Sequence, residues 1–236
     1  MVLVLSYSLL FRVECCQHQC FSSALNALNL LLNIVTGKLI IISAPSGAGK
    51  TSLARALIAS ADDIMMSISH TTRSQRAGEE DGKDYFFVSQ PEFISMVGDD
   101  VFLEYAEVYG NFYGTSRVAV EKMLEQGINV LLDIDWQGAR KVRELMPDAV
   151  SISVLPPSVE ELERRLRSRG SDPESVIQSR MTQALDEMAH CREADFIVLN
   201  DDFNQALDDL SLILNGESDK LRALNVDIDA LLATSV

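Results

Sequence analysis

The sequence lacks the long apolar stretches of a membrane protein. No uninterrupted apolar run reaches about 18 residues, the length that a helix needs to cross a bilayer, and the mean hydropathy is only +0.09. Prolines are also few, at 6 in 236 residues, whereas 47% of the residues are hydrophobic and 23% are charged. This composition excludes a disordered tail or a disulfide-bonded miniature scaffold, and it is ample for one domain of ordinary size.

Basic residues are scarce. The chain has 20 Lys and Arg against 35 Asp and Glu, which gives a formal net charge of -15 and a pI near 4.5. Such a chain repels polyanions, so we expect no nucleic acid partner. Any anionic ligand must be bound by a local positive site.

Cysteines are few and unevenly placed. Three of the 4 cysteines, Cys15, Cys16 and Cys20, lie near the start, and only Cys191 lies in the rest of the chain. The main part of the chain therefore has no cysteine pair for a disulfide, which predicts a reducing, cytoplasmic location. A structural zinc site needs a second ligand pair farther along the chain, so we expect no zinc at residues 15–20.

The first 36 residues differ in character from the rest. Residues 2–11 resemble the apolar core of a signal peptide, but no basic segment precedes them and no small-residue cleavage site follows closely. We expect residues 1–36 to be an extension outside the fold. The native start would then lie near Val35, because valine can be encoded by an alternative start codon.

A glycine-containing loop stands between a predicted strand and a predicted helix. Residues 38–43 are a continuous apolar, β-branched run, typical of a strand buried on both faces of a parallel sheet. Residues 52–58 favour a helix. The loop between them consists of Ala44, Pro45, Ser46, Gly47, Ala48, Gly49, Lys50 and Thr51. A loop in this context is typical of a nucleotide phosphate site.

The loop matches the Walker A pattern except that Ala44 replaces the opening glycine. Gly47 and Gly49 still allow backbone N–H groups to converge on phosphate oxygens. Lys50 can reach the β- and γ-phosphates, and the Thr51 hydroxyl can ligate Mg²⁺. We therefore expect ATP to bind here with Mg²⁺, the alternative being an ordinary turn with a chance lysine.

Two arginines three positions apart, Arg73 and Arg76, stand in a polar stretch near Ser69 and Tyr85. Guanidinium and hydroxyl groups suit a phosphate monoester, which offers several acceptor oxygens to bidentate donors. A solvated basic loop accounts for these residues equally well. The pattern alone leaves both interpretations open.

Together these motifs resemble those of the guanylate kinases, P-loop enzymes that phosphorylate GMP to GDP with ATP. The resemblance runs in family order across residues 37–214. The segments that carry it are residues 43–51, 69–76, 82–87, 102–107, 110–115, 132–138, 164–170 and 198–201.

The resemblance implies roles for individual residues at the acceptor site. The residues that it assigns to the GMP phosphate are Ser69, Arg73, Arg76, Tyr85 and Tyr113. Those that it assigns to guanine are Glu104, Thr115 and Asp135. A carboxylate such as Glu104 accepts hydrogen bonds from guanine N1–H and from the exocyclic amine. Adenine has no donors in those places, so AMP should be strongly disfavoured.

The resemblance also implies a mobile lid whose arginines, Arg165, Arg169 and Arg180, act with Lys50 and Arg73 on the transferring phosphate. A solvated basic helix face is the alternative for the first two. Asn200 matches a residue near the ATP adenine, although a strand-end asparagine is also a common turn residue.

Asp133 resembles a Walker B carboxylate that acts on Mg²⁺ through water, with a purely structural role as the alternative. The apolar residues 128–132 precede it and predict a strand that delivers it at its carboxyl end, where α/β sheets bind ligands.

The order of motifs predicts an α/β fold: a P-loop NTPase core with a largely parallel central sheet flanked by helices, a small mixed β GMP-binding insertion and a helical lid. Strand-like pieces at residues 85–88 and 101–105 favour the insertion. The expected boundaries are 37–216 for the kinase domain (core 37–68, 128–157 and 191–216; GMP-binding subdomain 69–127; lid 158–190) and 217–236 for an acidic tail.

The predicted function is transfer of the γ-phosphoryl group of ATP to GMP, and also to dGMP. The predicted partners are these nucleotides, with no nucleic acid and no membrane. A non-catalytic, guanylate-kinase-like binding module is the alternative from another class. A P-loop kinase for a different phosphate monoester is the third possibility.

Overall fold

The computed structural model describes residues 36–108, 110–168 and 174–233. By its internal contacts the chain divides into Met1–Thr36 and Gly37–Val236, and everything described below belongs to the second unit. The predicted N-terminal extension, residues 1–36, lies outside the described residues except for Thr36.

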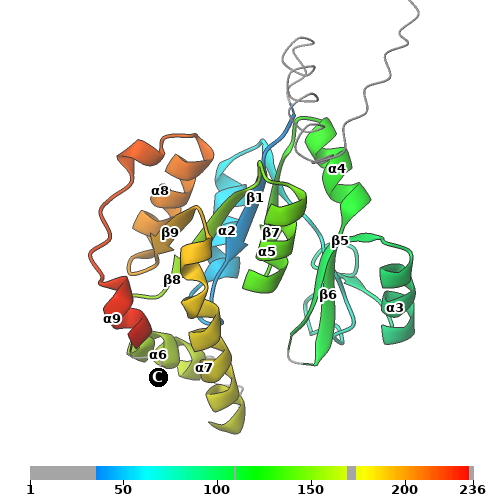
Figure 1. The fold of residues 1–236 in the computed structure, drawn as a ribbon. Coiled ribbons are helices and arrows are strands. Elements are labelled where there is room, and N and C mark those ends of the chain that lie inside the picture. The colour runs from blue at the N-terminus through cyan, green and yellow to red at the C-terminus, as the bar shows by residue number, and fades with distance from the viewer. Residues whose placement is uncertain (1–35, 109, 169–173, 234–236) are drawn as a thin grey trace, which may run out of the picture. The chain divides into compact units, whose positions relative to one another are not determined.

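A five-stranded parallel sheet forms the centre of this unit, with the strand order β2-β7-β1-β8-β9 (Figure 1). The strands are β2 (Ile64–Met66), β7 (Asn129–Asp133), β1 (Leu39–Ser43), β8 (Val150–Leu155) and β9 (Phe196–Leu199). All five residues of the middle strand β1 are buried. The apolar run that predicted a doubly buried strand is therefore confirmed.

Helices cover both faces of the sheet (Figure 1). They are α2 (Lys50–Ser60) and α8 (Phe203–Leu214) on one face, and α4 (Arg117–Glu125) and α5 (Trp136–Leu145) on the other. Successive β1 side chains point to opposite faces. Ile40 and Ile42 pack in the first core and Leu39 and Ile41 in the second. With both faces covered, the carboxyl ends of the strands remain as the place for a ligand.

A second, mixed sheet has the order β4-β3-β6-β5. Its elements are β3 (His70–Thr71), β4 (Phe86–Phe87), β5 (Phe102–Val108) and β6 (Asn111–Ser116), with α3 (Gln90–Gly98) beside them. The rings of Phe93 and Phe102 stack at 4.6 Å and those of Phe93 and Phe112 at 5.5 Å. The predicted mixed β insertion is confirmed, and β5 continues three residues beyond the expected end at Tyr105.

The helices α6 (Val159–Ser168) and α7 (Glu174–Ala189) build a third core. Leu162 and Leu166 of α6 meet Met181 and Met188 of α7 there, together with Leu231 of α9 (Ile228–Ala233). The same core includes Leu155 and Leu199, at the ends of β8 and β9. The helical region is thus anchored to the central sheet by apolar packing.

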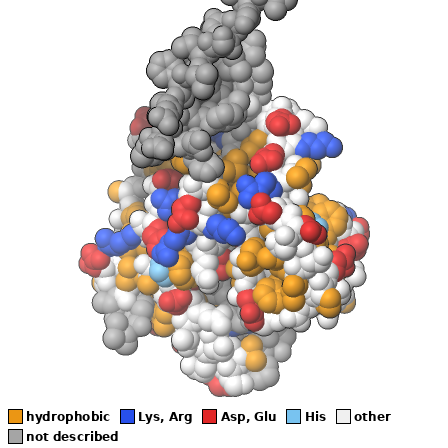
Figure 2. All heavy atoms as spheres, turned by 45° about the vertical axis from the view of Figure 1, so that its right-hand side comes forward, with side chains coloured by type: hydrophobic (Ala, Val, Ile, Leu, Met, Phe, Trp, Pro, Cys, Tyr) orange, Lys and Arg blue, Asp and Glu red, His pale blue; other side chains and the backbone are white. Residues whose placement is uncertain are grey.

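None of the described helices has the length and apolar composition needed to cross a membrane. On the face drawn in Figure 2, Lys and Arg side chains are interspersed with Asp and Glu side chains. The coloured part of that face presents no continuous basic track.

The segment after α8 contains the short 3-10 helix η2 (Ser218–Lys220) and is fastened by Arg222. Its guanidinium donates to Asp209 at 2.7 Å, to Gln205 at 3.0 Å and to the Leu199 carbonyl at 2.5 Å, and it pairs with Asp201 at 2.9 Å. These bonds tie the chain after α8 to α8 itself and to the end of β9.

We predict that Arg222→Ala lowers the free energy of unfolding by about 2–4 kcal/mol, because it leaves the buried Asp209 carboxylate without its cation. The melting temperature should fall by about 2–4 °C for each kcal/mol. Thermal and urea denaturation measure both. Lys220→Ala is the control, since the exposed Lys220 makes a surface ion pair with Glu217 and its loss should change stability by less than about 0.5 kcal/mol. Equal losses in the two variants would contradict the prediction.

Candidate functional site

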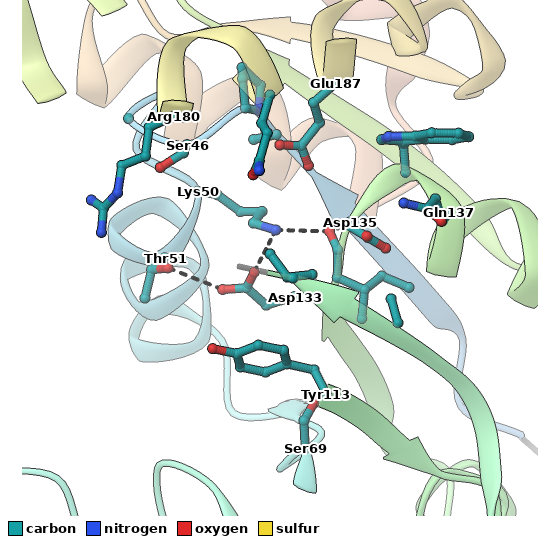
Figure 3. A pocket seen from close by; sticks show the side chains of 18 of the residues that line it. Ser46, Lys50, Thr51, Ser69, Tyr113, Asp133, Asp135, Gln137, Arg180 and Glu187 are labelled. Carbon is teal, nitrogen blue, oxygen red and sulfur yellow. Dashed lines mark hydrogen bonds and ion pairs between the residues drawn. The ribbon is translucent and has the colours of Figure 1, made fainter. Parts of the chain in front are cut away.

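A cleft of about 960 Å³ opens at the carboxyl ends of β1 and β7. The second sheet contributes its wall on one side and α7 on the other, as Figure 3 shows for Tyr113 and Ser69 opposite Arg180 and Glu187. The predicted site residues that line it are Ala44, Pro45, Ser46, Gly47, Gly49, Lys50, Thr51, Ser69, Arg76, Tyr85, Glu104, Tyr113, Asp133, Asp135 and Arg180. Five segments that are separate in the sequence therefore meet at one cavity.

The loop after β1 has the backbone of a phosphate site. Gly47 and Gly49 have φ values of +99° and +97°, in the left-handed region that favours glycine. A Cβ on Gly49 would lie 2.5 Å from the Asn200 amide nitrogen, so a larger residue is excluded there. Gly49 is the N-cap of α2, whose first backbone N–H groups lack partners within the helix and face the loop.

Lys50 is held at the centre of the cleft (Figure 3). Its ammonium group lies 2.9 Å from an Asp133 carboxylate oxygen and donates to the Ile134 carbonyl at 2.8 Å. Burial lowers the pKa of Lys50, but the attraction of Asp133 and Glu187 outweighs it, so the net direction is upward. Lys50 is therefore a fixed positive charge.

The other Asp133 oxygen accepts a hydrogen bond from the Thr51 hydroxyl at 3.2 Å. These two side chains form a pair of hard oxygen groups at the start of α2. Among the described residues, no three His, Cys, Asp or Glu side chains are grouped to hold a metal ion by themselves. A cation at Thr51 and Asp133 would need further oxygen ligands from a bound molecule.

Glu104 and Thr115 face each other on the paired strands β5 and β6. Both are buried, and the Thr115 hydroxyl donates to the Glu104 carboxylate at 2.5 Å. Burial raises the pKa of Glu104 to about 7, the Thr115 bond opposes that shift, and the nearby Asp135 adds to it. Thr115 supports the carboxylate from behind, while Glu104 lines the cleft.

Asp135 and Gly138 complete this wall at the start of α5. The Asp135 side chain caps the helix by accepting from the Gly138 N–H at 2.8 Å. A Cβ at Gly138 would lie only 2.7 Å from Glu104 and 3.2 Å from Asp135. Glycine at position 138 thus allows two carboxylates to approach the same backbone.

Four of the residues predicted to bind phosphate line the cleft with hydrogen-bond donors: Ser69, Arg76, Tyr85 and Tyr113. Arg73, which is among the described residues, does not line the cleft. Its guanidinium lies 5.4 Å from the Tyr85 ring and binds Glu79 at 2.7 Å. The structure therefore brings together the residues predicted to bind the GMP phosphate, except for Arg73, which lies behind Tyr85.

Asn200 and Arg165 lie behind the phosphate loop. The buried Asn200 amide donates to the Ala48 carbonyl at 2.6 Å. Arg165 donates to the Asn200 carbonyl at 3.0 Å and to Ala48 at 3.5 Å, and it also pairs with Glu161. In this structure both predicted ligand residues hold the loop rather than line the cavity. Arg169 lies outside the described residues.

Sequence reasoning missed several cleft residues, chiefly Gln183, Asp186 and Glu187 of α7. Burial raises the pKa of Glu187 to about 7, with Lys50 opposing the shift. A signal was available, because positions 180, 183 and 187 follow the spacing of one helix face. Trp136 lines the cleft as well, and its ring stacks on the His190 ring at 3.5 Å.

Comparisons with known proteins agree with one another. A family model described as guanylate kinase matches residues 36–217. The guanylate kinase of Yersinia pestis bv. Antiqua (strain Antiqua) is 54% identical over 202 residues, which cover 85% of this chain and 98% of that protein. The guanylate kinase of Salmonella typhi is 52% identical over 199 residues, covering 84% and 96%. A crystal structure of guanylate kinase from Anaplasma phagocytophilum aligns with a TM-score of 0.65 at 37% identity, covering 79% of this chain and 88% of that one.

We predict that Glu104→Gln stabilises the ligand-free protein in a pH-dependent way. Because the folded pKa of about 7 is above the ordinary value of 4.5, the wild type loses stability as the pH rises from 4.5 to 7. Glutamine carries no such charge. The variant should melt within about 1 °C of the wild type at pH 5 and several degrees above it at pH 8, at about 2–4 °C per kcal/mol.

Thermal denaturation of both proteins at the two pH values tests this. Glu121→Gln, at an exposed position on α4, is the matched control. Its melting temperature should differ from that of the wild type by the same amount at both pH values. A Glu104→Gln melting temperature below that of the wild type at pH 8 contradicts the prediction.

Proposed function

The chain belongs to the guanylate kinase family, and we infer that it transfers the γ-phosphoryl group of ATP to GMP, giving ADP and GDP. The observation that carries this conclusion is that the glycine-containing loop after β1 and the buried carboxylate of Glu104 line one cleft. Lys50, Thr51 and Arg76 line the same cleft, and no feature of the described site favours a non-catalytic binding module.

We propose that the loop of residues 44–51 binds the donor phosphates. Backbone N–H groups at the start of α2 and the Lys50 ammonium would surround the β- and γ-phosphates. Lys50 is already held by Asp133 and the Ile134 carbonyl, so little side-chain freedom is lost on binding. The loop is also fixed from behind by Asn200 and Arg165. The donor site is therefore largely preorganised.

We propose that Thr51 and Asp133 hold Mg²⁺, the hydroxyl directly and the carboxylate through water. Their oxygens are adjacent, and hard oxygen ligands suit this ion. When bound, the ion would neutralise charge on the β- and γ-phosphate oxygens. The ion pair between Asp133 and Lys50 would then weaken, and the charge of Lys50 would become available to the nucleotide.

We propose that Glu104, with Asp135 and Thr115, recognises guanine. The carboxylate of Glu104 can accept from N1–H and the exocyclic amine, which adenine does not offer. Thr115 occupies one oxygen from behind and orients the carboxylate. Since a buried acceptor that stays unpaired is costly, AMP would be rejected by a large factor.

The GMP phosphate is proposed to bind Arg76, Ser69, Tyr85 and Tyr113, with Arg73 supporting them from behind Tyr85. This arrangement would set the acceptor phosphate opposite the phosphate loop, in line for transfer. Because that phosphate is an anion at neutral pH, a strong general base is not required. The protein contributes alignment and positive charge.

We propose that Arg165, Arg169 and Arg180 act on the transferring phosphoryl group as the lid closes. The position of Arg180 on the cleft wall supports its proposed role, and the contact of Arg165 with the phosphate loop supports that of Arg165. Guanidinium groups there would stabilise charge that develops during transfer, and closure would exclude water.

The proposed parts are a core around the parallel sheet, a GMP-binding subdomain around the mixed sheet at residues 69–127, and a lid at residues 158–190. The two separate sheets and the third apolar core support this division. A cytoplasmic location is also proposed, from the scarcity of cysteine in the main part of the chain.

We predict that Lys50→Ala reduces kcat at least about 100-fold with ATP, Mg²⁺ and GMP, because the central cation is lost. A coupled assay of ADP formation measures this. The wild type should use AMP, CMP and UMP at least about 100-fold less efficiently than GMP. Lys122→Ala, an exposed lysine on α4, is the control and should match the wild type. No turnover of GMP by folded wild-type protein would refute the proposed function.

We predict that KM for GMP depends on pH through Glu104. Below pH 7 the Glu104 carboxyl is protonated in the free protein and cannot accept both guanine donors, so KM should rise by up to about tenfold per pH unit as the pH falls. The GMP phosphate also titrates near pH 6. Glu104→Gln separates the two effects, because it keeps the phosphate titration only. Identical pH profiles of KM for both proteins would contradict the assignment.

A further inference from the structure

One carboxylate in the loop after β3, that of Glu79, binds two parts of the phosphate-recognition segment at once. Its Oε1 accepts from the Arg73 guanidinium at 2.7 Å, and its Oε2 accepts from the Arg76 backbone N–H at 2.8 Å. The Arg73 and Glu79 side chains are 12% and 19% exposed, so water competes little for this pair. Glu79 itself does not line the cleft in the described part of the chain.

The backbone of Glu79 closes a turn. The Glu79 N–H donates to the Arg76 carbonyl at 3.2 Å, and the Gln75 side chain donates to the Glu79 carbonyl. Gly78, within the turn, has a φ of +88°, a conformation that glycine adopts without strain. The backbone that carries Arg76 is therefore fixed relative to the Glu79 carboxylate.

Several groups hold Arg73. Its Nη1 donates to the Ser74 carbonyl at 2.8 Å, its Nη2 binds Glu79, and its guanidinium lies 5.4 Å from the Tyr85 ring and 5.8 Å from the Phe87 ring. The guanidinium also interacts with Tyr113. Because a guanidinium has five N–H donors, its bonds to Ser74 and Glu79 leave others for Tyr113 and for an anion. Burial lowers and the Glu79 bond raises the pKa of Arg73, with a net upward direction.

We propose that Glu79 is a positioning residue for the acceptor phosphate. It sets the Arg73 guanidinium and the Arg76 backbone in one arrangement before GMP arrives, and it remains bound to Arg73 while the phosphate takes the remaining donors. The proposal rests on the proposed function, in which Arg73 and Arg76 serve the GMP phosphate.

A competing account predicts the opposite change in GMP affinity when the charge of Glu79 is removed. If Glu79 only blocked Arg73 until the phosphate displaced it, removing its charge would strengthen GMP binding. The second bond favours positioning, because Oε2 holds the Arg76 N–H, a backbone group that displacement from Arg73 does not release. The sign of the change in GMP affinity therefore separates the two accounts.

The test compares Glu79→Gln with Glu80→Gln. The glutamine at 79 can accept only one of the two bonds, because its NH₂ group is a donor. Glu80 is the adjacent carboxylate, with its side chain 68% exposed and bonded to Lys83 at 3.3 Å, so its replacement makes the same change in net charge. Dissociation constants of GMP and of guanosine, which lacks the phosphate, are measured by calorimetry, together with kcat and both KM values.

Glu79→Gln should raise the dissociation constant and KM for GMP about tenfold, because the arginine must be ordered on binding. Guanosine affinity, KM for ATP and kcat should change less than about twofold. Glu80→Gln should match the wild type, and Glu79→Asp, which keeps the charge, should recover part of the loss.

Unchanged or tighter GMP binding by Glu79→Gln would overturn the proposal, as would equal weakening of GMP and guanosine. The comparison of GMP with guanosine needs no turnover. A wild type that binds GMP but does not phosphorylate it would refute the proposed function and still leave the role of Glu79 decided by the binding ratio.

Discussion

The hydrogen bond from the Asn200 side chain to the Ala48 carbonyl is the constraint on which the site depends. A glycine-rich loop has much conformational freedom, and that freedom must be removed before its N–H groups converge on phosphate. Asn200 removes it by joining the end of β9 to the loop. This contact restricts the neighbouring position, since only glycine fits at position 49 beside the Asn200 amide.

That bond is itself supported by segments far away in the chain. Arg165 of α6 binds the Asn200 carbonyl, and Arg222 binds the flanking Leu199 carbonyl and the Asp201 side chain. The phosphate loop is therefore shaped by the helical region and by the chain after α8, as well as by its own sequence. Movement of α6 would be transmitted to Ala48 through these contacts, which provides a physical link between the proposed lid and the donor site.

The acidic composition has a consequence in and behind the cleft. Several cations that could attract phosphates are already paired: Lys50 with Asp133, Arg73 with Glu79, and Arg165 with a glutamate one turn earlier. Pairing fixes the direction of each cation and reduces the cost of ordering it. It also lowers the net attraction for anions, so binding depends on donors in fixed places more than on overall charge.

Much of this arrangement could be predicted from the sequence, because its signals are local. The apolar run before the phosphate loop predicted β1, and the resemblance of the motifs to those of guanylate kinases predicted that Lys50, Arg76 and Glu104 would serve one site. Partners created by tertiary contact have no such signal. Nothing near Asn200 in the sequence indicates that its amide reaches back 152 positions to Ala48.

The buried carboxylate of Glu104, which we propose reads the base, shows how selectivity and stability can oppose each other in this fold. Glu104 is 3% exposed and has one short bond, to Thr115, so its charge is poorly compensated when the cleft holds no ligand. Gly138 brings a second carboxylate, Asp135, close to it and adds repulsion. A base with two donors relieves this cost, whereas a base without them leaves it in place. Under the proposed function, the discrimination between purines would therefore come from an unfavourable interaction built into the ligand-free protein.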